Sequence, residues 1–207
     1  MARTIVGLFD TFAQAQQAVQ DLTSSGVRRD DISIIASDSR GEYARELGGE
    51  SKAGEGAVGG AIGGGVLGGV LGLLVGIGAL AIPGIGPVIA AGPLAAALGA
   101  AGASAVAGAG IGAASGGLIG ALVGAGIPEE EAHVYAEGVR RGGALVSVTT
   151  DDMSAGAVQA SLRSHGAVDI RSRGEEWRRS GWSGFDPNAE PYTSEWESSE
   201  ERRRRRQ

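Results

Sequence analysis

The chain has 207 residues, no cysteine and a formal net charge of −6. This length allows one or two domains, the absence of cysteine excludes disulfides and thiolate chemistry within the sequence, and the acidic balance argues against a general nucleic-acid-binding protein. No charged residue occurs between Glu55 and Glu129, so the charge lies in the segments on either side. The opening MARTIVGLFD has no apolar signal-peptide core, and we therefore expect a protein that starts in the cytoplasm.

Residues 1–38 predict a strand, a helix and a second strand, which together form a βαβ unit. The run TIVGLFD at 4–10 is rich in the residue types of strands. We expect Asp10 to cap the following helix and Gly26 to end it. The run DISIIASD at 31–38 alternates as a second strand does. Apolar residues recur at helical spacing between the two strands, at Phe12, Ala15, Val19 and Leu22.

Residues 39–56 read as a polar linker, and residues 57–126 form an uncharged block rich in glycine and alanine. Prolines and glycines interrupt this block in the run IPGIGPVIAAGP at 82–93. Because proline cannot continue a helix interior, we predict an αα-hairpin of residues 57–81 against residues 93–126. The predicted turn contains Pro83, Gly84, Gly86, Pro87 and Pro93.

Glycines recur every four residues in both predicted helices of the hairpin. Residues four apart lie on one helix face, so each row forms a groove without side chains. Such grooves let a partner backbone approach closely, as in GxxxG packing between membrane helices. We therefore predict a glycine zipper with two rows, Gly60, Gly64, Gly68, Gly72 and Gly76, and Gly108, Gly112, Gly116, Gly120 and Gly124.

The surroundings of this hairpin can be lipid or protein. Each predicted helix is long enough to cross the hydrocarbon layer, and two crossings return the chain to its starting side. A cytoplasmic side is favoured by the basic residues before the block, Arg40, Arg45 and Lys52, and by Arg140 and Arg141 after it. Against lipid, the block has no aromatic residue and is strongly apolar only at 70–82. A soluble homo-oligomer with hairpins packed on one another, or switching between the two states, remains open.

Residues 127–173 return to ordinary globular patterning, with a helix, a strand, a second helix and a last strand. Pro128 and the glutamates at 129–131 suit the start of the first helix, whose apolar face is Ala132, Tyr135, Ala136 and Val139. The strands are expected at 144–151 and 167–172, on either side of a helix at 154–165. Two βαβ halves predict an α+β fold with a ferredoxin-like, four-stranded antiparallel sheet, into which the hairpin is inserted.

Residues 174–207 contain all three tryptophans but no apolar periodicity, and we predict a disordered tail. The arginine run at its end could bind anionic lipid or RNA, although acidic residues in the same tail also favour a solvated, charge-balanced segment. The run consists of Arg202, Arg203, Arg204, Arg205 and Arg206.

Recognisable catalytic or cofactor motifs are not found. The GxGxxG match at 54–59 follows a polar linker instead of a strand, so it does not predict a dinucleotide site. No P-loop lysine follows a glycine run, and no GxSxG marks a nucleophile. The glutamates at 129–131 fit a helix N-terminus better than a metal site, and His133 is expected at the surface. We expect no enzyme activity, no cofactor and no metal.

The phrases TIVGLFDTFAQAQQAVQDLTSSGVRRDDISIIA, IPGIGPVIAAGPLAAAL and GIPEEEAHVYAEGVRRGGALVSV resemble the general stress protein 17M-like, heat-induced domain and its glycine-rich bacterial relatives. The resemblance covers about residues 3–172, implies stress-linked expression and a ferredoxin-like core, and carries no catalytic residue. The first hypothesis is a non-enzymatic stress-response protein whose hairpin binds or enters the inner membrane from the cytoplasmic side and oligomerises. The alternatives are a soluble, cytoplasmic homo-oligomer and a small-ligand regulatory domain.

Overall fold

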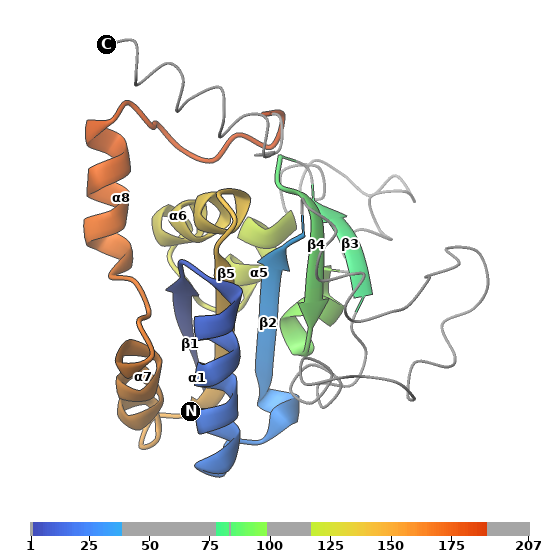
Figure 1. Cartoon of the computed structure of the whole chain (residues 1–207), viewed down its shortest axis with the longest axis vertical. Coiled ribbons are helices and arrows are strands. Elements are labelled where there is room, and N and C mark those ends of the chain that lie inside the picture. Colours follow the sequence, from blue (N-terminus) through green and yellow to red (C-terminus); the bar gives the residue numbers. More distant parts are fainter. Residues whose placement is uncertain (1, 39–77, 83, 99–116, 190–207) are drawn as a thin grey trace, which may run out of the picture.

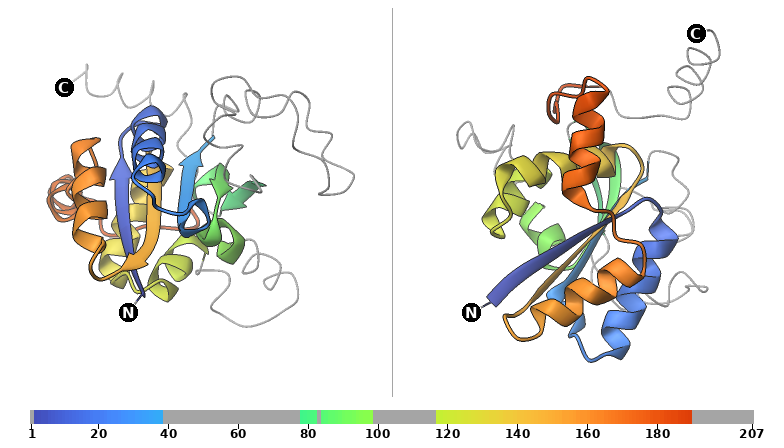
Figure 2. Two further views of the ribbon diagram at one scale, coloured as in Figure 1. Left: turned by 90° about the horizontal axis from the view of Figure 1, so that it is seen from below. Right: turned by 90° about the vertical axis from the view of Figure 1, so that its left-hand side faces the viewer.

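A computed structural model describes residues 2–38, 78–82, 84–98 and 117–189 (Figure 1). The described elements form an α+β fold around a five-stranded antiparallel sheet with the order β1-β5-β2-β4-β3. Helices cover both faces of this sheet, as the two further views in Figure 2 show. The expected α+β class is therefore confirmed, with one layer of helices more than a ferredoxin-like arrangement has.

The three strands β1 (Ala2–Phe9), β5 (Ala144–Asp151) and β2 (Ile32–Ser37) agree with the strands expected from the sequence. β5 lies between the other two and is antiparallel to both. All six residues of β2 are buried, because a strand in the interior of a sheet covered on both faces has no solvent side.

The first face of the sheet is covered by α1 (Phe12–Ser24) and α7 (Ala155–Ser164). The predicted apolar face of α1 is confirmed, since Phe12, Ala15, Val19 and Leu22 are all buried there. The predicted cap is wrong: Thr11, not Asp10, is the N-cap, in a reciprocal capping box with Gln14. The Thr-x-x-Gln spacing was the signal for it.

The second face is covered by α6 (Glu129–Arg140), α5 (Gly117–Gly124) and a helical turn at 93–98. The glutamates of the first turn of α6 and its predicted apolar face are confirmed. Tyr135 Oη donates a hydrogen bond to the carbonyl oxygen of Val6, 3.2 Å away, and so fixes α6 on β1. Burial raises the pKa of the Tyr135 phenol far above its ordinary value, so this donor stays protonated.

The predicted αα-hairpin is wrong at residues 78–81, which belong to a strand, whereas residues 93–98 and 117–124 are helical, as expected of its second helix. β3 (Gly78–Ile82) and β4 (Gly86–Ala91) form a β-hairpin that extends the sheet beyond β2. A tight turn joins these strands: Ile85 N donates to Ile82 O at 3.0 Å, and Gly84 and Gly86 have φ of +76° and +92°. Pro87 lies in β4, Pro93 begins the next helical turn, and Pro83 lies outside the described residues.

The predicted last strand at 167–172 is also wrong. Val168 N donates to Leu8 O at 2.7 Å, which places it beside β1 where a fourth ferredoxin-like strand would lie. Asp169 then caps a helix, α8 (Ile170–Arg179), by accepting a hydrogen bond from Ser172 N. The ferredoxin-like sheet therefore differs from the observed one at both edges, by a missing strand beside β1 and an added hairpin beside β2.

The predicted disorder from residue 174 onwards is wrong for residues 174–189. Trp177 of α8 is buried, and the Trp182 ring meets it edge-on with centroids 5.8 Å apart. Residues 190–207, including the five arginines, lie outside the described part of the chain, as do the linker and most of the glycine-rich block. Among the described residues, none of the helices has the length and hydropathy needed to cross a bilayer.

Candidate ligand pocket

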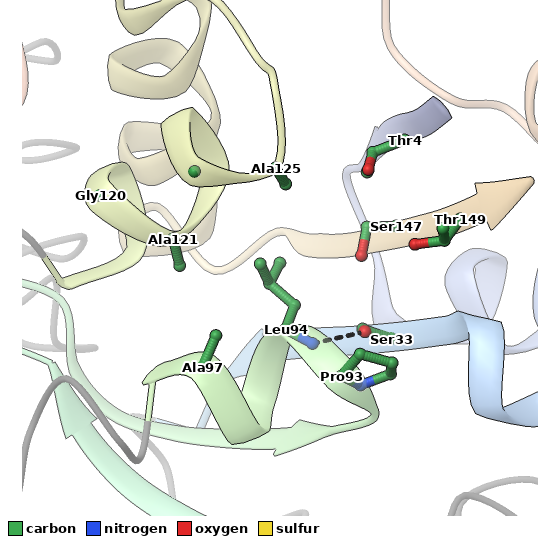
Figure 3. A pocket seen from close by; sticks show the side chains of 11 residues that line it. Thr4, Ser33, Pro93, Leu94, Ala97, Gly120, Ala121, Ala125, Ser147 and Thr149 are labelled. Atoms are coloured by element: carbon green, nitrogen blue, oxygen red, sulfur yellow. Dashed lines mark hydrogen bonds between the residues drawn. The ribbon is translucent and has the colours of Figure 1, made fainter. Parts of the chain in front are cut away.

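A pocket of about 580 Å³ lies between the second face of the sheet and the small residues of α5 and of the turn at 93–98 (Figure 3). The sheet forms its floor and the two helical segments form its walls. The pocket is lined by Thr4, Ser33, Pro93, Leu94, Ala97, Gly120, Ala121, Gly124, Ala125, Ser147 and Thr149.

The floor consists of four hydroxyl-bearing residues on three neighbouring strands, which we call the hydroxyl quartet: Thr4, Ser33, Ser147 and Thr149. Ser33 of β2 is directly opposite Ser147 of β5, and Thr149 of β5 is directly opposite Thr4 of β1. Side chains alternate between the faces of a strand, so the quartet shares its face with the apolar Leu8, Ile35 and Leu145. This face therefore changes from apolar to polar along the strands.

The turn at 93–98 is held against the floor by a close backbone approach. Gly92 has a φ of +91°, and a Cβ there would lie only 2.7 Å from Ser33 Cα. Glycine is required for both reasons. Two residues further on, Leu94 N donates a hydrogen bond of 2.9 Å to Ser33 Oγ. Pro93 and Leu94 are thereby fixed at the edge of the pocket.

The opposite wall is the glycine face of α5. Leu118 and Leu122 are buried in the apolar cluster on the second face of the sheet and anchor this helix there, while Gly120 and Gly124 line the pocket. A Cβ at either glycine would meet no described atom within 4 Å. These two glycines of the predicted second row thus border open space in the described structure, and the other eight glycines of the two rows lie outside it.

None of the pocket-lining residues is ionisable. The wall and floor therefore offer hydroxyls, backbone groups and apolar side chains, without a carboxylate, imidazole or ammonium group from this set. Within the described ranges, no group of three or more metal-ligating side chains is found either. The arrangement can bind a neutral molecule, and its side chains supply no strong acid or base for catalysis.

The glutamates at the start of α6 make ion pairs with α8. Glu130 Oε1 lies 2.6 Å from Arg178 Nη2, and Glu131 Oε1 lies 3.4 Å from Arg171 Nε. These glutamates thus help to tie α8 to α6. His133, expected at the surface, is only half-buried, but its Nδ1 atom is buried without a hydrogen-bond partner in the described structure.

A second charged cluster was missed by the sequence analysis. Glu137 is completely buried and accepts hydrogen bonds from Arg140 and Arg141, with the Arg141 Nε atom 2.6 Å from Glu137 Oε1. The guanidinium carbon of Arg141 lies 4.5 Å from the centre of the Trp177 ring. This cluster joins α6 to α8, and its i, i+3 and i, i+4 spacing within EGVRR was the available signal.

Of the comparisons with known proteins, only the one with family models gives a match. Neither a curated protein nor a solved structure matches the chain. Residues 4–81 match the family model described as the heat induced stress protein YflT domain, which confirms the resemblance to heat-induced stress proteins over those residues. The match includes α1, β2 and most of β1 and β3, and with them Thr4 and Ser33 of the pocket floor. Residues 4–81 of this chain are therefore similar to the heat induced stress protein YflT domain.

Proposed function

We propose that this protein takes part in the stress response without catalysing a reaction, by reversibly binding a small neutral molecule in the pocket beneath α5. The stress role is supported by the domain match at residues 4–81. The binding role corresponds to the small-ligand regulatory domain that the sequence left open as an alternative.

The observation that carries this proposal is the pocket itself. Its volume of about 580 Å³ lies in the range of roughly 300–1,000 Å³ that is common for small-molecule sites. Its lining combines small apolar walls with a few polar groups held on rigid strands, which is also typical of such sites. Because the lining residues carry no charge, a neutral ligand avoids the cost of leaving an ion unpaired.

The test uses N-phenyl-1-naphthylamine, a neutral dye whose fluorescence rises in apolar surroundings. We expect saturable binding to the full chain and loss of most of that signal in Gly120→Leu, whose side chain would enter the pocket. The substitution leaves the helix intact, because leucine favours helices by up to about 1 kcal/mol over glycine and no described atom obstructs it.

The matched control is Gly156→Leu, an equally unobstructed glycine in the exposed part of α7. It should bind the dye as the original chain does. If the dye does not bind the original chain, or if both leucine variants bind it equally, the pocket is not a ligand site.

A second candidate function is self-association or membrane association through the predicted glycine rows, on the cytoplasmic side of the inner membrane. It is favoured by one observation: Val123, between Gly120 and Gly124, has 42% of its surface exposed. An apolar side chain beside two open glycines offers a surface that another helix could cover.

This candidate is separated from ligand binding by the variant Gly68→Leu with Gly116→Leu, which leaves the pocket-lining glycines in place. Self-association predicts that the elution volume on a sizing column changes in this variant. Membrane association predicts that the full chain sediments with membranes when lysate is ultracentrifuged without detergent. Recovery of the whole protein in the supernatant would exclude insertion.

A further inference from the structure

The chemistry of the pocket floor identifies a class of ligand. Resting on the proposed binding function, we propose that the ligand is a neutral amphiphile: a polyhydroxylated, sugar-like head on the hydroxyl quartet and an apolar body between α5 and the turn at 93–98. Neither the family match nor the pocket's volume specifies this.

The quartet is contiguous across the sheet. Ser33 and Ser147 are directly opposite one another, Ser147 and Thr149 are two residues apart on one face of β5, and Thr149 is directly opposite Thr4. Directly opposite Cβ atoms in antiparallel strands are about 4.5–5.5 Å apart, so adjacent hydroxyls can contact neighbouring hydroxyls of one sugar ring.

Each hydroxyl of the quartet can both donate and accept a hydrogen bond, which matches the same dual capacity in a sugar hydroxyl. Ser33 shows this directly. Its Oγ accepts from Leu94 N at 2.9 Å, and that bond does not use the hydroxyl hydrogen. Ser33 and Ser147 are 2% and 5% exposed, so they form the deep end of the floor, while Thr4 and Thr149 lie nearer to solvent.

Charged head groups do not fit this floor. The lining supplies no arginine or lysine for a carboxylate, sulfate or phosphate, and no carboxylate for an amine. An ion placed there would give up water without gaining a partner of opposite charge. A neutral polyol exchanges its hydrogen bonds with water for hydrogen bonds with the quartet.

The apolar side chains in the walls of the pocket indicate that the ligand has an apolar body. Ala97, Ala121 and Ala125 face the pocket together with Leu94 (Figure 3). A free sugar would leave these side chains in contact with water, whereas an attached alkyl chain would cover them. Only a molecule that has both a polyhydroxylated head and an apolar body therefore contacts both the hydroxyl floor and the apolar walls of the pocket.

The test displaces bound N-phenyl-1-naphthylamine with octyl β-D-glucoside, octyl sulfate and methyl β-D-glucoside, each below any micelle-forming concentration. We expect the octyl glucoside to displace the dye at about tenfold lower concentration than either competitor. Octyl sulfate has the same chain with a charged head, and methyl glucoside has the same head without the chain. Equal displacement by octyl sulfate, or by methyl glucoside, would overturn the proposal.

The variant Ser147→Ala with Thr149→Val removes two hydroxyls at nearly constant volume. It should weaken octyl glucoside by about tenfold relative to the dye measured in the same variant, as expected for two lost hydrogen bonds. The control Thr150→Val makes the same change on the opposite face of β5 and should alter neither the affinity for octyl glucoside nor the affinity for the dye. Intact dye binding with unchanged glucoside affinity in the double variant overturns the ligand class alone, whereas failure of the dye to bind overturns the proposed function itself.

Discussion

Glu137 shows what a single buried charge does in this fold. Its side chain has no exposed surface, yet it receives hydrogen bonds from Arg140 Nε at 2.9 Å and from Arg141 Nε at 2.6 Å. Arg141 in turn lies over Trp177. One carboxylate thus positions the cation that binds α8.

Glu137→Gln should therefore be strongly destabilising. Removing one member of a buried ion pair leaves the arginines without their counter-charge, at a cost of about 3–5 kcal/mol in the free energy of unfolding. Urea denaturation followed by circular dichroism measures it. Glu130→Gln, which breaks the exposed ion pair with Arg178, should cost less than about 1 kcal/mol. Similar losses in both variants would show that Glu137 has no special role.

Gly138, next to Glu137, is a helical glycine with a packing reason. A Cβ on it would lie 2.7 Å from Leu8 Cδ1 and 3.1 Å from Leu8 Cγ, and Leu8 is only 2% exposed. The side chain of Leu8 is packed within the apolar cluster on the second face of the sheet, so it has little room to move. Glycine here lets α6 lie directly on β1.

Gly138→Ala should accordingly lower the unfolding free energy by about 1–3 kcal/mol through overpacking, despite the better helix propensity of alanine. Gly156→Ala in α7 is the matched control, since a Cβ there meets nothing within 4 Å. That variant should be neutral or more stable by up to about 1 kcal/mol. Thermal and urea unfolding of the two proteins compare them directly, and a stabilised Gly138→Ala would contradict the packing argument.

At the scale of elements, the sequence correctly predicted the helices and strands whose hydropathy pattern lies within a single segment of the chain. The buried faces of α1 and α6 follow from 3.6-residue periodicity, and β5 was predicted with its exact bounds. The sequence did not predict α8, because AVDIRS has the short alternation of a strand. The signals for a helix are Asp169 as its N-cap, and the buried Gly174 and Trp177 at spacings of four and seven residues from Ile170. Its packing depends on α6, which no local pattern reveals.

The cap of α8 predicts a response to acid. Hydrogen bonding from Ser172 N holds the pKa of the Asp169 carboxyl below its ordinary value of 3.8. A carboxyl with a depressed pKa in the folded state stabilises the fold fully above its ordinary pKa, and this contribution is lost as the pH falls through the folded value. The protection factor of the Ser172 amide against hydrogen exchange should thus fall as the pH drops below that ordinary value. In Asp169→Asn, which keeps an acceptor without a titrating group, the exchange should not show that step.

At the scale of the whole molecule, the largest error concerned the glycine-rich block. The sequence predicted an insertion separate from the sheet domain, because GALAI and GPVIAA are short apolar runs that periodicity cannot assign to strand or helix. In the structure these runs are β3 and β4. The pocket was equally beyond the sequence, since the quartet comes from three strands whose register depends on the assembled sheet.

Parts of the block are members of the core. Val88, Leu94, Leu98, Leu118 and Leu122 are buried in the cluster on the second face of the sheet. They cover Ile35 and Leu145 together with residues of α6. β4 also occupies the edge of β2 by pairing with residues 34–37. The block is therefore structural in its described part.

Deletion of residues 57–126 tests whether the glycine-rich block is an independent insertion or a structural part of the sheet domain. If the block were an independent insertion, the remaining chain would unfold cooperatively with nearly unchanged stability. The structure instead predicts that α6 alone would remain on the second face and that the edge of β2 would be open. Uncovering Ile35 and Leu145, at about 1.5–3 kcal/mol each, removes a large part of the roughly 5–15 kcal/mol that stabilises a typical domain. We expect a chain that aggregates or lacks a cooperative urea transition by circular dichroism. A chain ending at residue 189 retains every described element and should keep that transition.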